Sequence, residues 1–173
     1  MAGKPQQVEQ LEPRAPAAGA SATKANHFLY PGRIFTSKES KTITIIVGSC
    51  IAVCLWDSRP GIGGAAHYML PVWEGDGEPS ARYGDIAIKQ LIQELTALGV
   101  GPKQLRAKLF GGNCMFQAMR DNANLSVGAK NIRIAYDLLA QTGILVTLAK
   151  VGGARGQRII FQTNTGESSD SSL

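Results

Sequence analysis

A thiol and an imidazole are the side chains of this sequence whose types and spacing favour chemistry. Cys50 follows Gly48 and Ser49 at a break between two apolar runs, and His67 lies 17 residues later in the segment AAHYML. A cysteine becomes a competent nucleophile when a nearby imidazole or a positive dipole end lowers its pKa. Because the N–H groups of a glycine-containing turn are natural oxyanion donors, Gly48 and Ser49 are candidate oxyanion residues. We therefore expect a thiol active site in which Cys50 is the nucleophile and His67 the base.

A third member of this site is expected at Thr44, on the strand that leads into the turn. Thr44 and Cys50 are six residues apart, an even separation that keeps both on one side of a regular strand. A hydroxyl or a main-chain carbonyl at Thr44 would hold the imidazole through its second nitrogen, the task of the carboxylate in other triads.

The alternative is that these residues only pack, as a satisfied core histidine and a small buried cysteine. Cys54 lies inside a continuous apolar run and is expected to do nothing else. Cys114 follows Gly111, Gly112 and Asn113, so it is the rival nucleophile, but no residue near it in the sequence would activate it.

Other chemistries have little support. The sequence has no Gly-Lys-Ser/Thr after a glycine run, no G-x-S-x-G elbow and no helix after the glycines of PGIGG. Three cysteines cannot form a closed disulfide framework, and no C-x-x-C or H-x-x-x-H spacing favours zinc. We therefore expect no cofactor and no metal.

Composition favours one domain of moderate size. The chain has 173 residues, of which 44% are hydrophobic, and a formal net charge of +5. Nine basic residues and two acidic ones lie between positions 101 and 160, a balance that favours an acidic partner, and no nucleic-acid module accompanies them. No apolar run is long enough to cross a bilayer, and no secretory signal precedes the domain, so we expect a cytoplasmic protein without membrane insertion.

The pattern of apolar residues predicts an α+β sandwich over residues 28–165, between a disordered tail at 1–27 and a polar tail at 166–173. Three- and four-residue spacing predicts helices at 85–98 and about 129–140. Apolar and β-branched runs predict strands at 41–47, 51–56, 65–70, 106–110, 144–151 and 157–163.

The sequence resembles the CheD family of chemoreceptor glutamine deamidases. The segments that carry the resemblance occur in order over about residues 34 to 167 and are Gly48–Asp57, Gly63–Pro71, Tyr83–Ile88, Phe110–Gly112, Val127–Asn131 and Gly152–Gly156. The most specific part is the combination of the Cys50 turn, the His67 segment and the interval between them. After Phe110–Gly112 the chain departs from the family by continuing with Asn113 and Cys114.

This resemblance implies a cysteine-dependent protein-glutamine deamidase that acts on methyl-accepting chemotaxis receptors through a thioester. It assigns the nucleophile to Cys50, the base to His67 and the orienting threonine to Thr44. It also implies a mixed α/β/β/α sandwich similar to the catalytic domain of the cytotoxic necrotizing factor toxins. The same acyl-enzyme would hydrolyse glutamate methyl esters.

The resemblance further implies a CheC-type phosphatase as a partner. The alternative function is therefore a non-catalytic regulatory protein that binds this phosphatase in chemotaxis signalling. A thiol hydrolase that acts on another protein or on a small amide is a third reading.

Overall fold

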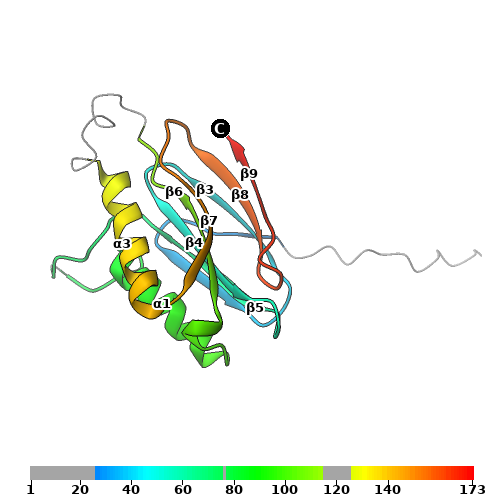
Figure 1. The fold of residues 1–173 in the computed structure, drawn as a ribbon. Helices are drawn as coiled ribbons and strands as arrows, with labels where there is room; N and C mark the ends of the chain where they lie inside the picture. The colour runs from blue at the N-terminus through cyan, green and yellow to red at the C-terminus, as the bar shows by residue number, and fades with distance from the viewer. Residues whose placement is uncertain (1–25, 76, 115–125) are drawn as a thin grey trace, which may run out of the picture.

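The structure is a computed structural model that describes residues 26–75, 77–114 and 126–173. Two β-sheets form its centre. The four-stranded sheet has the order β1-β3-β8-β9, and the five-stranded sheet has the order β2-β5-β4-β6-β7 (Figure 1). The elements are β1 (Asn26–Phe28), β2 (Arg33–Ser37), β3 (Thr42–Val47), β4 (Ile51–Asp57), β5 (Ile62–Tyr68), α1 (Gly84–Ala97), η1 (Pro102–Gln104), β6 (Arg106–Gly111), α3 (Val127–Thr142), β7 (Leu145–Val151), β8 (Gln157–Gln162) and β9 (Ser168–Ser172).

Strand β4 lies in the middle of the five-stranded sheet and is buried on both faces. It pairs antiparallel with β5 on one side and with β6 on the other. Ile51, Val53 and Leu55 face the helices, whereas Ala52, Cys54 and Trp56 face the second sheet. Because both faces need apolar side chains, the strand reads as one continuous apolar run and not as an alternating one.

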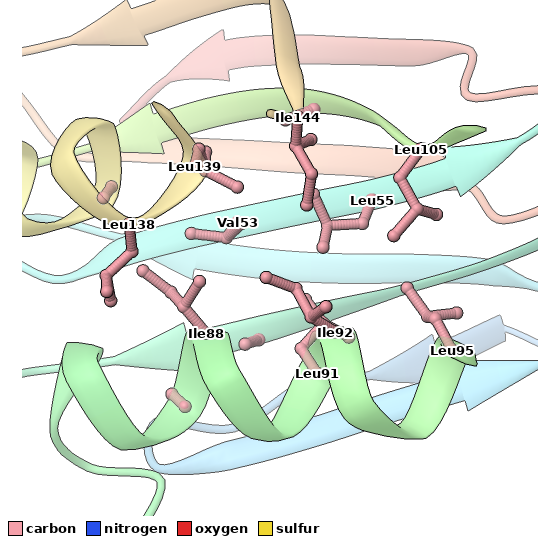
Figure 2. Packing of buried hydrophobic residues seen from close by; sticks show 14 of the residues in the cluster. Val53, Leu55, Ile88, Leu91, Ile92, Leu95, Leu105, Leu138, Leu139 and Ile144 are labelled. Carbon is pink, nitrogen blue, oxygen red and sulfur yellow. The ribbon is translucent and has the colours of Figure 1, made fainter. Parts of the chain in front are cut away.

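The two helices cover the same face of the five-stranded sheet (Figure 1). Helix α1 presents its apolar stripe to the sheet, and α3 packs beside it through Leu138 and Leu139. Figure 2 shows Ile88, Leu91, Ile92 and Leu95 of α1 pointing toward Val53 and Leu55 of β4. These side chains recur at three- and four-residue steps, which is the spacing that puts them on one helical face.

A second core lies between the two sheets. Ile43, Ile45 and Val47 of β3 alternate with polar or exposed residues and pack into the same cluster as Phe110 and Phe161. The period of two is that of a strand with one face buried. The layers formed by the described residues are therefore helices, five-stranded sheet and four-stranded sheet.

The α+β class and the main predicted elements are confirmed, but the described residues do not confirm the expected α/β/β/α sandwich. Both α1 and α3 carry their apolar faces to the five-stranded sheet, so within the described residues no helix covers the outer face of the four-stranded sheet. The expected likeness to the catalytic domain of the cytotoxic necrotizing factor toxins is thus not confirmed.

Two local predictions also need correction. Strand β5 spans Ile62–Tyr68, whereas the predicted strand covers 65–70. The earlier start includes Gly63, where a Cβ atom would collide with the carbonyls of Thr163 and Leu55, so the glycine allows the close approach of the chain here. The expected polar tail at 166–173 contains β9, which pairs antiparallel with β8. The expected tail at 1–27 lies outside the described residues up to position 25, and Asn26 and His27 belong to β1.

Candidate active site

The turn that carries Cys50 is held from outside by all three of its carbonyl groups. The Gly48 carbonyl accepts the N–H of Asn113 at 2.8 Å, and the Cys50 carbonyl accepts the N–H of Gly112 at 2.8 Å. The Ser49 carbonyl accepts Nδ2 of Asn131 at 3.0 Å. Among the described residues no other residue accepts a hydrogen bond from the N–H of Ser49 or Cys50, and the N–H of Cys50 interacts with its own thiol, so both N–H groups are candidate oxyanion donors.

The close approach of Gly111 fixes the position of Cys50. Gly111 ends β6 with a φ of 102°, and a Cβ atom there would collide with the Cys50 carbonyl and with Val47. Only glycine combines a positive φ with such a contact at no steric cost. The two glycines of this segment thus allow β6 to pass directly beside the cysteine turn.

His67 lies on the same face of the five-stranded sheet as Cys50. Its register partner on β4 is Ala52, which faces the core between the sheets. The hydrogen bond from Gly112 to Cys50 continues the β4–β6 pairing beyond Ile51, so Cys50, two residues before Ala52, keeps the same facing. Cys50 and His67 are therefore diagonal neighbours at the end of the β4–β5 pairing, a placement in which residues are typically about 7–8 Å apart.

The imidazole of His67 is almost completely buried and held by one carbonyl. Its Nδ1 lies 3.1 Å from the carbonyl oxygen of Leu29, and because a carbonyl only accepts, Nδ1 is the protonated nitrogen. Nε2 is buried without a hydrogen-bond partner among the described residues. In the neutral ring Nε2 therefore carries a free lone pair, as a general base requires.

Burial pushes both groups toward their uncharged forms. It raises the pKa of the Cys50 thiol, an effect partly offset by the residue's own N–H. It lowers the pKa of His67, an effect partly offset by the Leu29 carbonyl. Both directions favour a thiol beside a neutral imidazole at rest, and not an ion pair already formed.

Thr44 is linked to the histidine through Leu29. Its side chain alternates with Ile43 and Ile45, which face the inter-sheet core, and its hydroxyl donates to Oδ1 of Asn26 at 3.0 Å. Its carbonyl accepts the N–H of Leu29 at 2.9 Å, and the carbonyl of that same residue accepts Nδ1 of His67. The sequence had no means to indicate Leu29, because every residue type carries the main-chain carbonyl that does this work.

Asn131 is a second residue of the site that the sequence did not indicate. It is fully buried on α3, and its Nδ2 donates to the carbonyls of Ser49 and Met69. The available signal was an asparagine inside a predicted helix, beside residues of the core face. A buried amide needs hydrogen-bond partners, so an asparagine at such a position indicates contacts with polar groups elsewhere in the fold.

The other two cysteines have different surroundings. Cys54 is fully buried in the inter-sheet core, and burial raises the pKa of its thiol far above the ordinary value. Cys114 is partly buried, and its N–H donates to the carbonyl of Gly153 at 2.9 Å.

Across residues 26–75, 77–114 and 126–173, no cluster of three or more His, Cys, Asp or Glu side chains is placed to hold a metal ion. In the same ranges, no helix has the length and apolar character that crossing a bilayer requires.

Comparison with known proteins assigns the chain to a family. The family model described as CheD chemotactic sensory transduction matches residues 69–169. A protein of Trichlorobacter lovleyi named "Probable chemoreceptor glutamine deamidase CheD" is 40% identical over 140 residues, which are 81% of this chain and 86% of that protein. A protein of Sulfurimonas denitrificans with the same name is 39% identical over 139 residues, 80% of this chain and 88% of its own.

Among solved structures, Neisseria meningitidis protein NMB0706 is similar with a TM-score of 0.42 and 13% identity, over 75% of this chain and 64% of that one. A likeness at this level carries no argument about the fold or the site. The matches to the family model and to the curated relatives extend over most of the chain. The chain belongs to the CheD family.

Proposed function

We propose that this protein is a cysteine-dependent protein-glutamine deamidase whose substrates are methyl-accepting chemotaxis receptors. The names of its relatives support deamidation of chemoreceptors. The observation that carries the residue assignment is the state of His67, whose Nδ1 is fixed by a carbonyl and whose Nε2 is unpaired among the described residues, on the sheet face that Cys50 shares.

The reaction begins with a neutral thiol and a neutral imidazole. Nε2 of His67 takes the proton of Cys50 as the sulfur attacks the carboxamide carbon of a receptor glutamine, and the C=O electrons move to the oxygen. The N–H groups of Ser49 and Cys50, in the turn that begins at Gly48, hold this oxyanion. The apo arrangement need not show the Cys50–His67 hydrogen bond, since such bonds tighten when the substrate is bound.

Collapse of the tetrahedral intermediate expels ammonia, which receives the proton from Nε2, and leaves a thioester on Cys50. Water then attacks the thioester carbon while Nε2 takes one of its protons. The C–S bond breaks, the proton returns to the sulfur, and the glutamine has become a glutamate. During both proton transfers the carbonyl of Leu29 accepts the N–H of Nδ1 and so keeps the ring in orientation. Leu29 is itself held in place because its main-chain N–H donates to the carbonyl of Thr44. This contact is the orienting role we propose for Thr44.

Replacement of Cys50 tests the proposal. A purified cytoplasmic receptor fragment is incubated with the wild type, with Cys50→Ala and with Cys114→Ala, and the mass change from carboxamide to carboxylate is followed by peptide mapping. We expect Cys50→Ala to lose deamidation and Cys114→Ala to retain it. Deamidation by Cys50→Ala at the wild-type rate would refute the assignment of the nucleophile.

Hydrolysis of glutamate methyl esters follows from the same acyl-enzyme, with methanol as the leaving group in place of ammonia. A receptor fragment carrying methylated glutamates would show this activity as release of methanol. Because both reactions share the nucleophile, Cys50→Ala should abolish them together.

The regulatory alternative is separable from catalysis. If the chain acts in the cytoplasm chiefly as a partner of a CheC-type phosphatase, Cys50→Ala should bind that phosphatase as tightly as the wild type does, and the wild type should deamidate no receptor. Receptor deamidation by the wild type would favour the enzymatic function.

A further inference from the structure

Asn131 joins the two strands that carry the proposed reacting groups. The β4–β5 pairing ends at Ile51 and Tyr68, one step before Cys50 and its register neighbour Met69. At that level the Nδ2 of Asn131 donates to the Ser49 carbonyl at 3.0 Å and to the Met69 carbonyl at 2.8 Å. One side-chain amide thus bridges the segment before β4 and the segment after β5, where the hydrogen bonds between the two strands end.

The bridge is itself anchored in the core. Asn131 has no exposed surface, and its main-chain carbonyl accepts the hydroxyl of Tyr68 at 2.5 Å. Tyr68 is the residue directly after His67. The helix is therefore tied to the cysteine turn and to the histidine strand by the side chain and the main chain of one residue.

Keeping this amide in the core has a cost, because its Oδ1 is buried without a hydrogen-bond partner among the described residues. An unpaired buried oxygen is unfavourable. Alanine would remove that cost and is also a better helix former than asparagine. Stability of the helix alone therefore does not explain the choice of asparagine, whereas the two bonds from Nδ2 do.

We infer that Asn131 is a positioning residue, which holds the Cys50 turn at a fixed offset from the His67 strand so that the thiol remains within reach of Nε2. The inference rests on the proposed function for its meaning in catalysis. The positioning itself does not depend on the proposed function, since it concerns only how Cys50 and His67 are placed relative to each other. Misplacement by about 1 Å is enough to cost a reaction on the order of 100-fold.

The test measures this coupling without the receptor. The alkylation rate of Cys50 by iodoacetamide is followed at neutral pH by peptide mapping in the wild type, His67→Ala, Asn131→Ala and the double variant. In the wild type His67→Ala should slow alkylation, because the imidazole assists loss of the thiol proton. In the Asn131→Ala background the same change should have almost no further effect.

Thr163→Val is the matched control. Thr163 is also fully buried, and its hydroxyl also makes two hydrogen bonds, to the carbonyl of Glu39 and from the N–H of Lys41. It lies beside the end of β3 that is opposite the cysteine turn. We expect Thr163→Val to lower the unfolding midpoint yet to keep the His67 dependence of Cys50 alkylation. Asn131→Ser, which keeps one donor, should give an intermediate coupling and serves if Asn131→Ala does not fold.

Deamidation gives the second readout. If the wild type deamidates receptors, Asn131→Ala should lower kcat on the order of tenfold or more with little change in KM. Full His67 dependence of alkylation in Asn131→Ala or in Asn131→Ser would overturn the inference. A wild type that shows this dependence but deamidates no receptor would instead refute the proposed function and leave the positioning role intact.

Discussion

At the scale of the residue, burial decides the resting protonation state of the site. The thiol of Cys50 and the imidazole of His67 both lose solvation, so both favour the uncharged form. The Leu29 carbonyl then selects which nitrogen of the ring carries the proton. In the proposed mechanism Cys50 is therefore activated by transfer of its proton to His67 during attack, and not as a thiolate that exists beforehand.

The lowered pKa of His67 predicts a pH dependence of folding. The unfolded chain binds a proton on this ring near pH 6.5, whereas the folded chain resists it. The free energy of unfolding should thus fall as the pH drops below about 6.5, by up to about 1.4 kcal/mol per pH unit from this group. Urea unfolding of the wild type and His67→Gln between pH 5 and 7.5 measures this slope.

The variant His67→Gln should have the shallower slope because it lacks the titrating ring. His27→Gln is the control, since the His27 side chain is exposed. Equal slopes for the two variants would contradict the account of His67 as a histidine buried in its neutral form.

The sequence was sufficient to propose Cys50 and His67, because the cysteine follows a glycine turn, the histidine is the single one in the predicted domain, and both lie in the segments that resemble the CheD family. It was not sufficient for Leu29, whose contribution is a main-chain carbonyl, or for the fact that Thr44 turns its hydroxyl toward Asn26. Main-chain groups and strand facing near a break depend on the tertiary path of the chain, which periodicity does not encode.

At the scale of the element, the site is built where strands end. The cysteine turn joins β3 to β4, and its carbonyls accept N–H groups of Gly112 and Asn113, directly after β6, and the side-chain amide of Asn131 on α3. The segments of β4 and α1 were predictable because their apolar residues have the spacing that a buried strand and a helix with one buried face require. Strands β1, β2 and β9 were not, because they are short or polar edge strands that pair mainly through their main chains.

Gly111→Ala tests the contact between β6 and the cysteine turn. The new methyl group would be forced against the Cys50 carbonyl in addition to the strain of a positive φ. We expect a loss of unfolding free energy greater than 1 kcal/mol, roughly the cost of the φ strain alone, and a fall in kcat on the order of tenfold.

Gly143→Ala separates strain from contact. Gly143 caps α3 with a φ of 72° and has nothing within 4 Å of its Cβ position. It should lose only the strain, about 1 kcal/mol by urea unfolding, and keep its deamidation rate. Equal effects of the two alanines on kcat would show that the β6 contact does not set the position of Cys50.

At the scale of the whole molecule, part of the basic charge lies next to the site. Arg155 belongs to the loop whose carbonyls accept Nδ2 of Asn113 and the N–H of Cys114, and Asn113 in turn binds Gly48. Lys130 precedes Asn131 and lines a hollow of about 280 Å³ together with Arg133 and Asp137, which form an ion pair at 3.8 Å. Lys150 is likewise paired, with Asp170.

Charge reversal at Arg155 tests whether this charge steers an acidic substrate. Arg155→Glu should lower kcat/KM and weaken its dependence on ionic strength while kcat changes little, because exposed charges act mainly on association. Lys103→Glu is the control, since Lys103 lies in η1, before the start of β6 and away from the cysteine turn. The same loss for both variants would indicate a general effect of net charge and not steering at the site.

The most direct measurement of the central claim is the pH profile of Cys50 alkylation in the wild type and in His67→Ala, with the buried Cys54 as an unreactive internal reference. If Nε2 receives the thiol proton, the wild type should react faster than His67→Ala at neutral pH, and the two rates should converge in strong alkali, where the thiol ionises unaided. Identical profiles across the whole range would contradict proton transfer to His67, and with it the proposed mechanism.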